Sequence, residues 1–355
     1  MEARVLVTAA GSIIAQGIIK SLKLASQRGN IRYRIFAADM SLLAAGLYRC
    51  EGGALLPPAS SPRYLEALSE VCERFDIQAV FCGSDDELMT LAEAKTTTER
   101  RTGAKFMVGS KKGISTARDK WKTYEFCKAN NIPCAPSSLP QSREEFTRDQ
   151  GYPIVVKPRE GYGSAHLYIV NEAIEMEHAI SVITQAGWRP VLQKYLSGES
   201  EFTSGVTVDR ESKYTMSSIS IRKIIKHGQT YKAFIDDYSN IRKSAEEVAL
   251  KLHSPGPINI QTKIEKGNEK PLVFEINPRF SATCPIRAFA GVNEPDIVYR
   301  NTVLGEETKV GCYDRLVCMR YWNEVYVPMA SYEKSVDSGP GTTIKESGSL
   351  VPDYF

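Results

Sequence analysis

Four polar residues in the second half of the chain have the types and spacing of a magnesium site. Two extended runs flank a polar turn, and Glu275 and Asn277 share one face of the second run because they are two residues apart. A hairpin centred on that turn brings Gln261 opposite Glu275, beside Arg279. One carboxylate and two amide oxygens suit Mg2+, which takes its other ligands from water and phosphate.

The same alternation predicts the other face of this hairpin. Leu272, Phe274 and Ile276 should point away from the polar residues. A hairpin with one solvated polar face also fits this spacing, so the metal site needs support from other parts of the chain.

A lysine at the end of an apolar strand precedes a glycine-rich turn. Lys157 closes the run Ile154-Val155-Val156-Lys157, and Gly161, Gly163 and Ser164 follow. Exposed backbone N–H groups in such a turn, with a lysine beside them, can hold phosphate. The spacing is not that of a P-loop, and an ordinary surface turn remains the alternative.

A short linker after another apolar strand could recognise a nucleoside. Gln193, Lys194 and Leu196 lie at the strand end, and their backbone can offer donors and acceptors to a purine edge. Glu201 follows closely enough to bind ribose hydroxyls. A plain surface linker fits this segment equally well.

Composition restricts the class of protein. The chain has 355 residues, 42% of them hydrophobic and 25% charged, which indicates two or three globular domains. A net charge of +3 is too small to argue for a nucleic-acid partner, and no apolar run has the length of a membrane span. Eight scattered cysteines fit free thiols, and the four histidines have no zinc-ligand spacing. We therefore expect a soluble cytoplasmic protein.

Residues 1–108 alternate short apolar strands with amphipathic helices. This pattern predicts a doubly wound parallel sheet of the α/β class. Gly11 and Gly17 do not complete a Gly-x-Gly-x-x-Gly motif, which argues against a dinucleotide site. The acidic turn 85–87 is expected mainly to cap a helix N-terminus.

The pattern changes after residue 109. One helix is predicted over 116–130, followed by strands that suggest antiparallel α+β sheets. The role of the last segment, from 309 onward, does not follow from its residues.

The order of these motifs resembles the ATP-grasp superfamily. The plan consists of Asp119-Lys120, Lys157-Pro158 with its glycine turn, the segment 193–201, and Gln261 followed by Glu-Ile-Asn-Pro-Arg-Phe-Ser. The last run is most similar to the carbamoyl-phosphate-synthase-like branch. The resemblance reaches about residue 305. It implies a doubly wound domain at 1–108, an ATP-grasp domain at 109–308 and an extension at 309–355. The small lobe would span about 109–188 and the large lobe about 189–308.

The resemblance also implies a role for individual residues. The implied ATP contacts are Lys120 and Lys157 on phosphate, Gly161, Gly163 and Ser164 as the mobile loop over it, Gln193, Lys194 and Leu196 at adenine, and Glu201 at ribose. Gln261, Glu275 and Asn277 would be the metal ligands, and Arg279 and Arg222 would contact the transferred phosphate. Relatives usually have glycine where this chain has His166, so loop flexibility there is in question.

The family chemistry is carboxylate activation with ATP and Mg2+, for which Mn2+ could substitute. The implied activity is an ATP-dependent carboxylate–amine ligase that forms an amide through an acylphosphate and releases ADP and phosphate. The expected partners are small-molecule carboxylate and amine substrates, and possibly a second copy of the chain. Phosphorylation of a carboxylate or carbamate without amide formation, and a non-catalytic ATP-binding subunit, are the alternatives. Carbamoyl-phosphate synthesis is disfavoured because one grasp unit is present where that large subunit has two.

Overall fold

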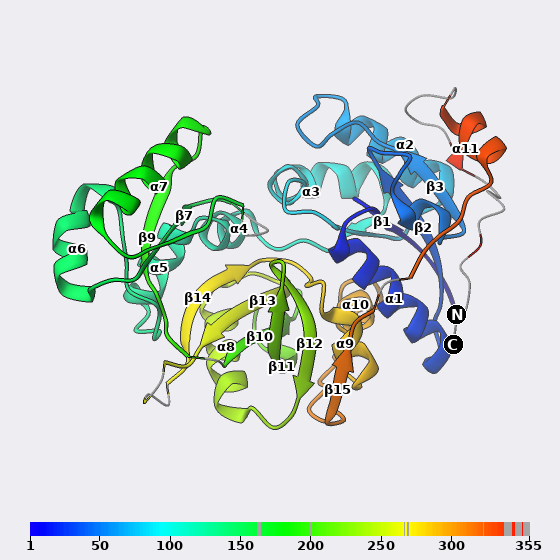
Figure 1. Ribbon diagram of the computed structural model, residues 1–355. Coiled ribbons are helices and arrows are strands. Elements are labelled where there is room, and N and C mark those ends of the chain that lie inside the picture. Colours follow the sequence, from blue (N-terminus) through cyan, green and yellow to red (C-terminus); the bar gives the residue numbers. More distant parts are fainter. Residues whose placement is uncertain are drawn as a thin grey trace.

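The computed structural model describes residues 1–161, 165–198, 200–265, 267, 270–321, 323–336, 343–344 and 350. The large lobe lies between a small lobe and an N-terminal domain (Figure 1). No helix in these ranges is both long and apolar enough to cross a membrane.

The N-terminal domain is built on a parallel sheet with strand order β3-β2-β1-β4-β5. Strands β2 and β3 are added on one side of β1 and strands β4 and β5 on the other, so the strand order switches between β1 and β4. The carboxyl ends of these two strands form the crevice where such sheets bind ligands. The doubly wound parallel sheet predicted from the sequence is confirmed. Its elements are β1 (Glu2–Val7), α1 (Ile13–Arg28), β2 (Arg32–Asp39), the 3-10 helix η1 (Ala45–Tyr48), β3 (Gly52–Leu55), α2 (Tyr64–Phe75), β4 (Ala79–Phe81), α3 (Leu88–Thr102) and β5 (Lys105–Phe106).

Helix α1 begins at the carboxyl end of β1 and packs on the large lobe. Ser12 caps it by accepting a hydrogen bond from the backbone N–H of Ala15 at 3.0 Å. A Cβ added at Gly17 would lie 3.2 Å from the sulfur of Cys284, so Gly17 permits close packing of α1 on the helix that begins at Cys284. Close helix packing therefore explains why residue 17 is glycine, although the Gly-x-Gly-x-x-Gly motif is incomplete.

The small lobe has an antiparallel sheet with strand order β6-β9-β7-β8. The single helix predicted over 116–130 is wrong, because the chain breaks at Asp119 into two helices. The Asp119 carboxylate accepts from the N–H of Trp121 at 2.9 Å, which starts a new helix at Lys120. The elements are α4 (Lys111–Arg118), α5 (Lys120–Ala129), β6 (Ser137–Ser138), η2 (Pro140–Ser142), α6 (Arg143–Gln150), β7 (Ile154–Pro158), β8 (Tyr168–Val170), α7 (Ala173–Gln185) and β9 (Pro190–Lys194).

The large lobe is an antiparallel sheet with strand order β14-β13-β10-β11-β12-β15. One face is covered by α8, whose Ala245 and Val248 pack on Ile258 and Ile260 of β13. Its elements are β10 (Glu201–Val208), β11 (Thr215–Lys226), β12 (Gln229–Ile235), α8 (Ser239–Lys251), β13 (Gly256–Lys263), β14 (Leu272–Asn277), α9 (Cys284–Phe289), α10 (Glu294–Tyr299), a π-helical turn (Arg300–Leu304) and β15 (Leu316–Met319).

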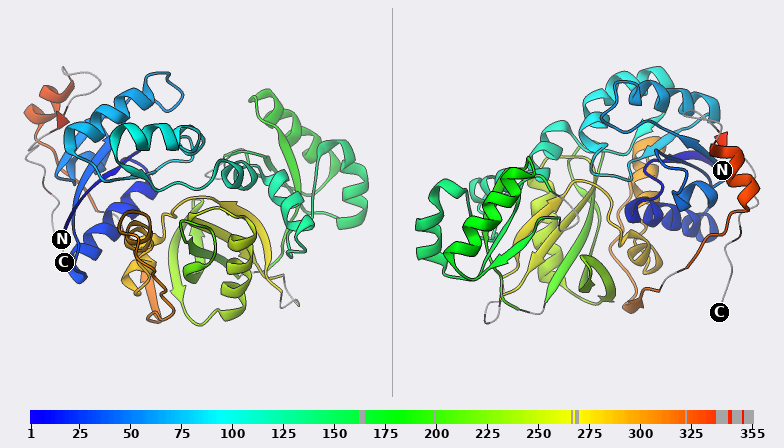
Figure 2. Two further views of the ribbon diagram at one scale, coloured as in Figure 1. Left: turned by 180° about the vertical axis from the view of Figure 1, so that it is seen from behind. Right: turned by 45° about the horizontal axis from the view of Figure 1, so that its top comes forward.

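The C-terminal segment joins the large lobe to the N-terminal domain. Strand β15 pairs with the edge strand β12, and β16 (Thr343–Ile344) pairs with the edge strand β3. Between them the chain passes α1 and forms α11 (Met329–Val336), as Figure 2 shows. The predicted extension thus supplies one strand to each of the two large sheets.

Candidate active site

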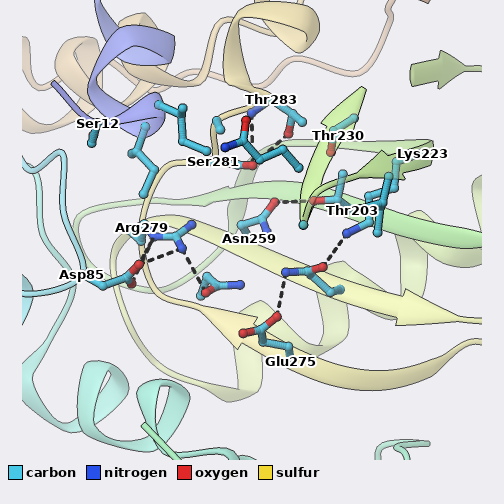
Figure 3. Close-up of a pocket in the computed structure, with 18 of the residues that line it drawn as sticks. Ser12, Asp85, Thr203, Lys223, Thr230, Asn259, Glu275, Arg279, Ser281 and Thr283 are labelled. Carbon is cyan, nitrogen blue, oxygen red and sulfur yellow. Dashed lines mark hydrogen bonds and ion pairs between the residues drawn. The ribbon is translucent and has the colours of Figure 1, made fainter. Parts of the chain in front are cut away.

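A cavity of about 710 Å3 lies where the three units meet. The N-terminal domain contributes the turns after β1 and β4, and the small lobe contributes the end of β7. The large lobe contributes the inner face of its sheet (Figure 3). The predicted residues on its wall are Lys120, Lys157, Gly161, Glu201, Gln261, Glu275, Asn277 and Arg279. Sequence positions more than 150 residues apart therefore converge on one site.

Lys157 is a buried cation held in a fixed position. Its Nζ donates to the Oε1 of Gln193 at 2.8 Å and lies 5.8 Å from the centre of the Phe274 ring. Burial lowers the pKa of Lys157 to about 8, and the positive charge of Lys120 adds to this effect. Among the residues that the structure describes, no carboxylate bonds the Lys157 ammonium. This cation is therefore well placed to bind phosphate.

Lys120 lies beside the glycine turn. Its Nζ donates to the carbonyl of Gly161 at 2.6 Å and is 3.9 Å from Glu275. The preceding residue, Asp119, is bonded by Arg159 at 2.6 and 3.0 Å, which ties the start of α5 to the end of β7. Gly163 and Ser164 lie outside the described residues.

The strand-end linker after β9 lies outside the described lining of the cavity. Lys194 pairs with Glu265 at 2.8 Å, and Leu196 is buried. Among the described lining residues of the cavity Gln193 is absent, because its side chain turns inward to Lys157 and to Ser137. The structure therefore gives the Gln193 side chain an anchoring role and leaves only its backbone for an adenine contact.

The predicted hairpin register is present. Gln261 lies directly opposite Glu275, and Asn259 lies opposite Asn277. The amide nitrogen of Gln261 donates to Glu275 at 2.8 Å, and its oxygen accepts from Lys223 at 2.6 Å (Figure 3). Glu275 thus offers oxygen to a cation as it stands, while the Asn277 oxygen also accepts from Arg279 at 3.1 Å. Gln261 would have to turn its amide to offer its oxygen.

One detail of the hairpin prediction is wrong. A β-bulge after Gln261 shifts the register, so Thr262 pairs with Val273. Val273 and Ile276 consequently enter the core, while Phe274 lines the cavity with Glu275 instead of facing away from it. The ring of Phe274 then forms a wall beside Lys157.

Lys223 is a site residue that was not predicted. It is buried on β11, where its Nζ pairs with Glu201 at 2.8 Å and donates to Gln261. Arg222, the predicted phosphate contact, lies on the opposite face with its guanidinium 4.1 Å from the Phe234 ring centre, outside the described lining of the cavity. Strand alternation permits only one of two adjacent residues to face the site.

Arg279 is joined to the N-terminal domain. Its guanidinium bonds the Asp85 carboxylate at 2.9 and 3.1 Å and also donates to Asn277 at 3.1 Å. Asp85 was expected to cap a helix, yet α3 begins after Glu87 with no side-chain capping bond. No spacing rule could link Asp85 to Arg279, because they are 194 residues apart.

Asn259 presents its amide nitrogen to the cavity. Its Oδ1 already accepts from Thr203 at 2.7 Å and from the buried Arg287 at 2.8 Å, which fixes the orientation of the amide. Arg287 is in turn paired with Glu294 at 3.2 Å. This buried network orients a cavity residue from beneath the sheet, and neither Thr203 nor Arg287 was predicted.

His166 has a left-handed backbone, with φ of 54°. That conformation strains most side chains, and histidine is one of the residues that tolerate it better. This positive φ accounts for the glycine that the family resemblance leads one to expect at position 166.

Two family models match this chain. An ATP-grasp domain model matches residues 117–283, and a PylC-like N-terminal domain model matches residues 5–105. A single grasp unit is present in the matched segment.

Relatives and solved structures agree with these models. The carbamoyl phosphate synthase large chain of Clostridium acetobutylicum is 28% identical over 274 residues, which is 71% of this chain and 25% of that protein. The chain thus spans about a quarter of the length of this relative.

Solved structures share the fold, among them the following two. The N5-carboxyaminoimidazole synthetase of Staphylococcus aureus with ADP gives a TM-score of 0.67 at 16% identity, covering 94% of this chain and 86% of that one. The biotin carboxylase domain dimer of Hydrogenobacter thermophilus 2-oxoglutarate carboxylase, with MgADP and bicarbonate, gives 0.68 at 16% identity, covering 87% and 71%. The chain therefore carries an ATP-grasp domain and a PylC-like N-terminal domain, and it is similar to carbamoyl phosphate synthase large chains.

Proposed function

We propose that this protein is an ATP-dependent carboxylate–amine ligase that forms an amide through an acylphosphate. The supporting observation is that Lys120, Lys157, Glu275, Asn277 and Arg279 line one cavity between the lobes. Cations for a triphosphate and oxygen ligands for a divalent ion are thereby brought to the same space.

The donor set fits magnesium. Glu275 supplies the carboxylate and Asn277 an amide oxygen, and Gln261 would join them after exchanging its bond to Lys223 for the ion. When bound, Mg2+ would neutralise phosphate charge, and Mn2+ could substitute. Among the described residues no group of three or more His, Cys, Asp or Glu competes as a metal site.

The side chains position reactants and stabilise charge. Lys120 and Lys157 would bind the triphosphate, and Arg279 would face the transferred phosphoryl group. A substrate carboxylate oxygen attacks the terminal phosphorus, and the bond to ADP breaks. The amine nitrogen then attacks the acyl carbon, the bond to phosphate breaks, and the nitrogen loses a proton to solvent or phosphate.

Two alternatives remain within this fold. The protein could phosphorylate a carboxylate or carbamate without forming an amide, or it could bind ATP as a non-catalytic subunit. The presence of Glu275, Asn277 and Arg279 together favours turnover over binding alone. We also propose a cytoplasmic protein that acts on small molecules, and a possible homodimer, since one structural neighbour is described as a dimer.

The test is a screen for ADP release. Purified protein with MgATP is mixed with amino acids, short peptides or uronic acids, with and without an amine, and ADP and phosphate are measured. Hydroxylamine should convert an acylphosphate into a hydroxamate. ADP release that needs both carboxylate and amine supports the ligase. Release with carboxylate alone and a hydroxamate product supports phosphorylation, while ATP binding without release across the screen would contradict both.

A further inference from the structure

Arg320 is a cavity cation supplied by the C-terminal segment. It follows β15 directly and lines the cavity together with Thr230, Ser281, Ala282 and Thr283. The matched ATP-grasp model ends at residue 283, so this arginine comes from a part of the chain that the family match does not cover.

Backbone carbonyls hold the Arg320 side chain in place. Its Nη1 donates to the carbonyl of Thr230 at 3.2 Å, and its Nη2 donates to the carbonyl of Ala282. Its own N–H donates to Tyr231 at 3.1 Å, which fixes the backbone against β12. The guanidinium is therefore oriented by neutral acceptors and retains further N–H donors for a ligand.

Arg320 differs in its ion pairing from two other cations of the cavity wall, Arg279 and Lys223. Arg279 is paired with Asp85, and Lys223 is paired with Glu201. No carboxylate within ion-pair distance of Arg320 occurs among the residues that the structure describes. Partly buried charges are normally compensated, so an uncompensated one in a cavity wall indicates an anionic ligand.

Neighbouring groups reinforce the positive potential. Burial lowers the pKa of Lys20 on α1, and the charges of Arg49 and Arg320 lower it further. Burial likewise lowers the pKa of Arg320, with no carboxylate opposing the effect. Lys120 and Lys157 on the small lobe account for the nucleotide phosphates, which leaves Arg320 for a second anion.

We propose that Arg320 binds an anionic group of the substrate that is not ATP, and so determines specificity for acidic substrates. This inference rests on the proposed function. The hydroxyls of Ser281 and Thr283, bonded to each other at 2.8 Å, lie next to Ala282 and complete the polar wall there. The anion could be a carboxylate or a phosphate ester, since a guanidinium fork binds both.

The experiment uses the full chain saturated with Mg2+ and the non-hydrolysable ATP analogue AMP-PNP. Glutarate and glycerol 3-phosphate are titrated separately by calorimetry into wild type, Arg320→Gln and Arg315→Met. The glutamine keeps a donor for the carbonyls and removes the charge. Arg315 is the control, because it is exposed on the same segment and pairs with Asp236.

We expect one of the two anions to saturate wild type and Arg315→Met alike, and to bind Arg320→Gln at least about tenfold more weakly. Which anion saturates identifies carboxylate or phosphate ester as the group. AMP-PNP affinity and the melting temperature should be the same in all three proteins.

Equal anion affinity in Arg320→Gln and wild type would overturn the inference, as would the failure of both anions to saturate wild type. Failure of wild type to bind AMP-PNP would instead contradict the proposed function. If Arg320→Gln melts early, Arg320→Lys replaces it: lysine keeps the charge without the fork and should bind the anion at least about threefold more weakly than wild type, and wild-type affinity there would count against the assignment.

Discussion

Asp85 and Arg279 form a bidentate ion pair that joins the N-terminal domain to the loop after β14. Both side chains are largely buried, at 9% and 13% exposure. Arg279 also donates to Asn277, so a carboxylate of the N-terminal domain helps to orient a proposed metal ligand. The first domain therefore participates in the site instead of only covering it.

Breaking this pair should affect both stability and turnover. Asp85→Asn leaves the Arg279 charge poorly compensated, and we expect the free energy of unfolding to fall by about 3 kcal/mol. Turnover should fall more than nucleotide affinity, because Lys120 and Lys157 remain to bind ATP. Denaturant unfolding, calorimetric ATP titration and ADP release measure these three quantities.

The double variant Asp85→Asn with Arg279→Gln provides the control. Contacting charges are not additive, so the double variant should be destabilised by at least about 1 kcal/mol less than the sum of the single variants. Strict additivity would show that the pair makes no energetic contribution.

Glu275→Gln should abolish most activity while the fold persists. The substitution removes the one full negative charge among the three proposed metal ligands, and Mg2+ prefers carboxylate oxygen. We expect ADP release to fall at least about a hundredfold, or roughly 3 kcal/mol in barrier height. The melting temperature should change little, because the Glu275 side chain is partly exposed and, among the described residues, its hydrogen bond comes from the Gln261 side chain. The strand pairing of its main chain is unaffected by the substitution.

Glu247→Gln is the matched control for that variant. Glu247 lies on the outer helix α8 and pairs with Lys251 at 2.7 Å, so the activity of Glu247→Gln should equal that of wild type. Wild-type turnover in Glu275→Gln would refute the metal assignment.

ATP affinity should decrease as the pH rises through about 8. Burial lowers the pKa of Lys157 to about 8 in the free protein, and only its protonated form attracts phosphate. Above that pH, binding must first add a proton, so the dissociation constant should increase by up to about tenfold per pH unit. Calorimetry between pH 7 and 9.5 measures this dependence of the dissociation constant on pH. Lys157→Met should bind ATP more weakly, and its dissociation constant should not increase through pH 8.

The same shift predicts how stability depends on pH. The folded pKa of about 8 is below the ordinary value of 10.5, so the unfolded chain holds more protons between these two values. The free energy of unfolding of wild type should therefore rise relative to Lys157→Met across this window, by about 3 kcal/mol in total. A flat difference between the two proteins would show that Lys157 titrates normally.

Local patterns were sufficient to predict much of this molecule. The parallel sheet followed from strand–helix alternation, and the opposition of Gln261 and Glu275 followed from the hairpin. Both depend on residues close in sequence. The β-bulge after Gln261 was not predictable, because one extra residue leaves no compositional signal, yet it places Phe274 on the cavity wall.

Contacts between residues far apart in the sequence were the main features of the site that could not be predicted. Asp85 with Arg279 and Asn259 with Arg287 depend on how domains and layers pack, which single-chain spacing does not encode. The break at Asp119 was in principle visible, since aspartate before Lys120 is a common helix N-cap. Arg320 lies beyond the recognised motifs, and the pairing of β15 with β12 brings it to the cavity.

Two adjacent basic residues on β11 give a final test. Lys223 faces the cavity, where it bonds Glu201 and Gln261, while Arg222 packs on Phe234 on the other face. Lys223→Met should leave the partly exposed Glu201 without its cation and release the Gln261 amide. We expect turnover to fall at least about tenfold, whereas Arg222→Met should stay within about twofold of wild type.

ADP release and calorimetric ATP titration on the two variants decide between the faces. Both substitutions remove one positive charge from the same strand, so a general effect of net charge would lower both activities equally. A larger loss in Arg222→Met would return the phosphate contact to Arg222, and would require the strand to present its other face to the nucleotide when ATP binds.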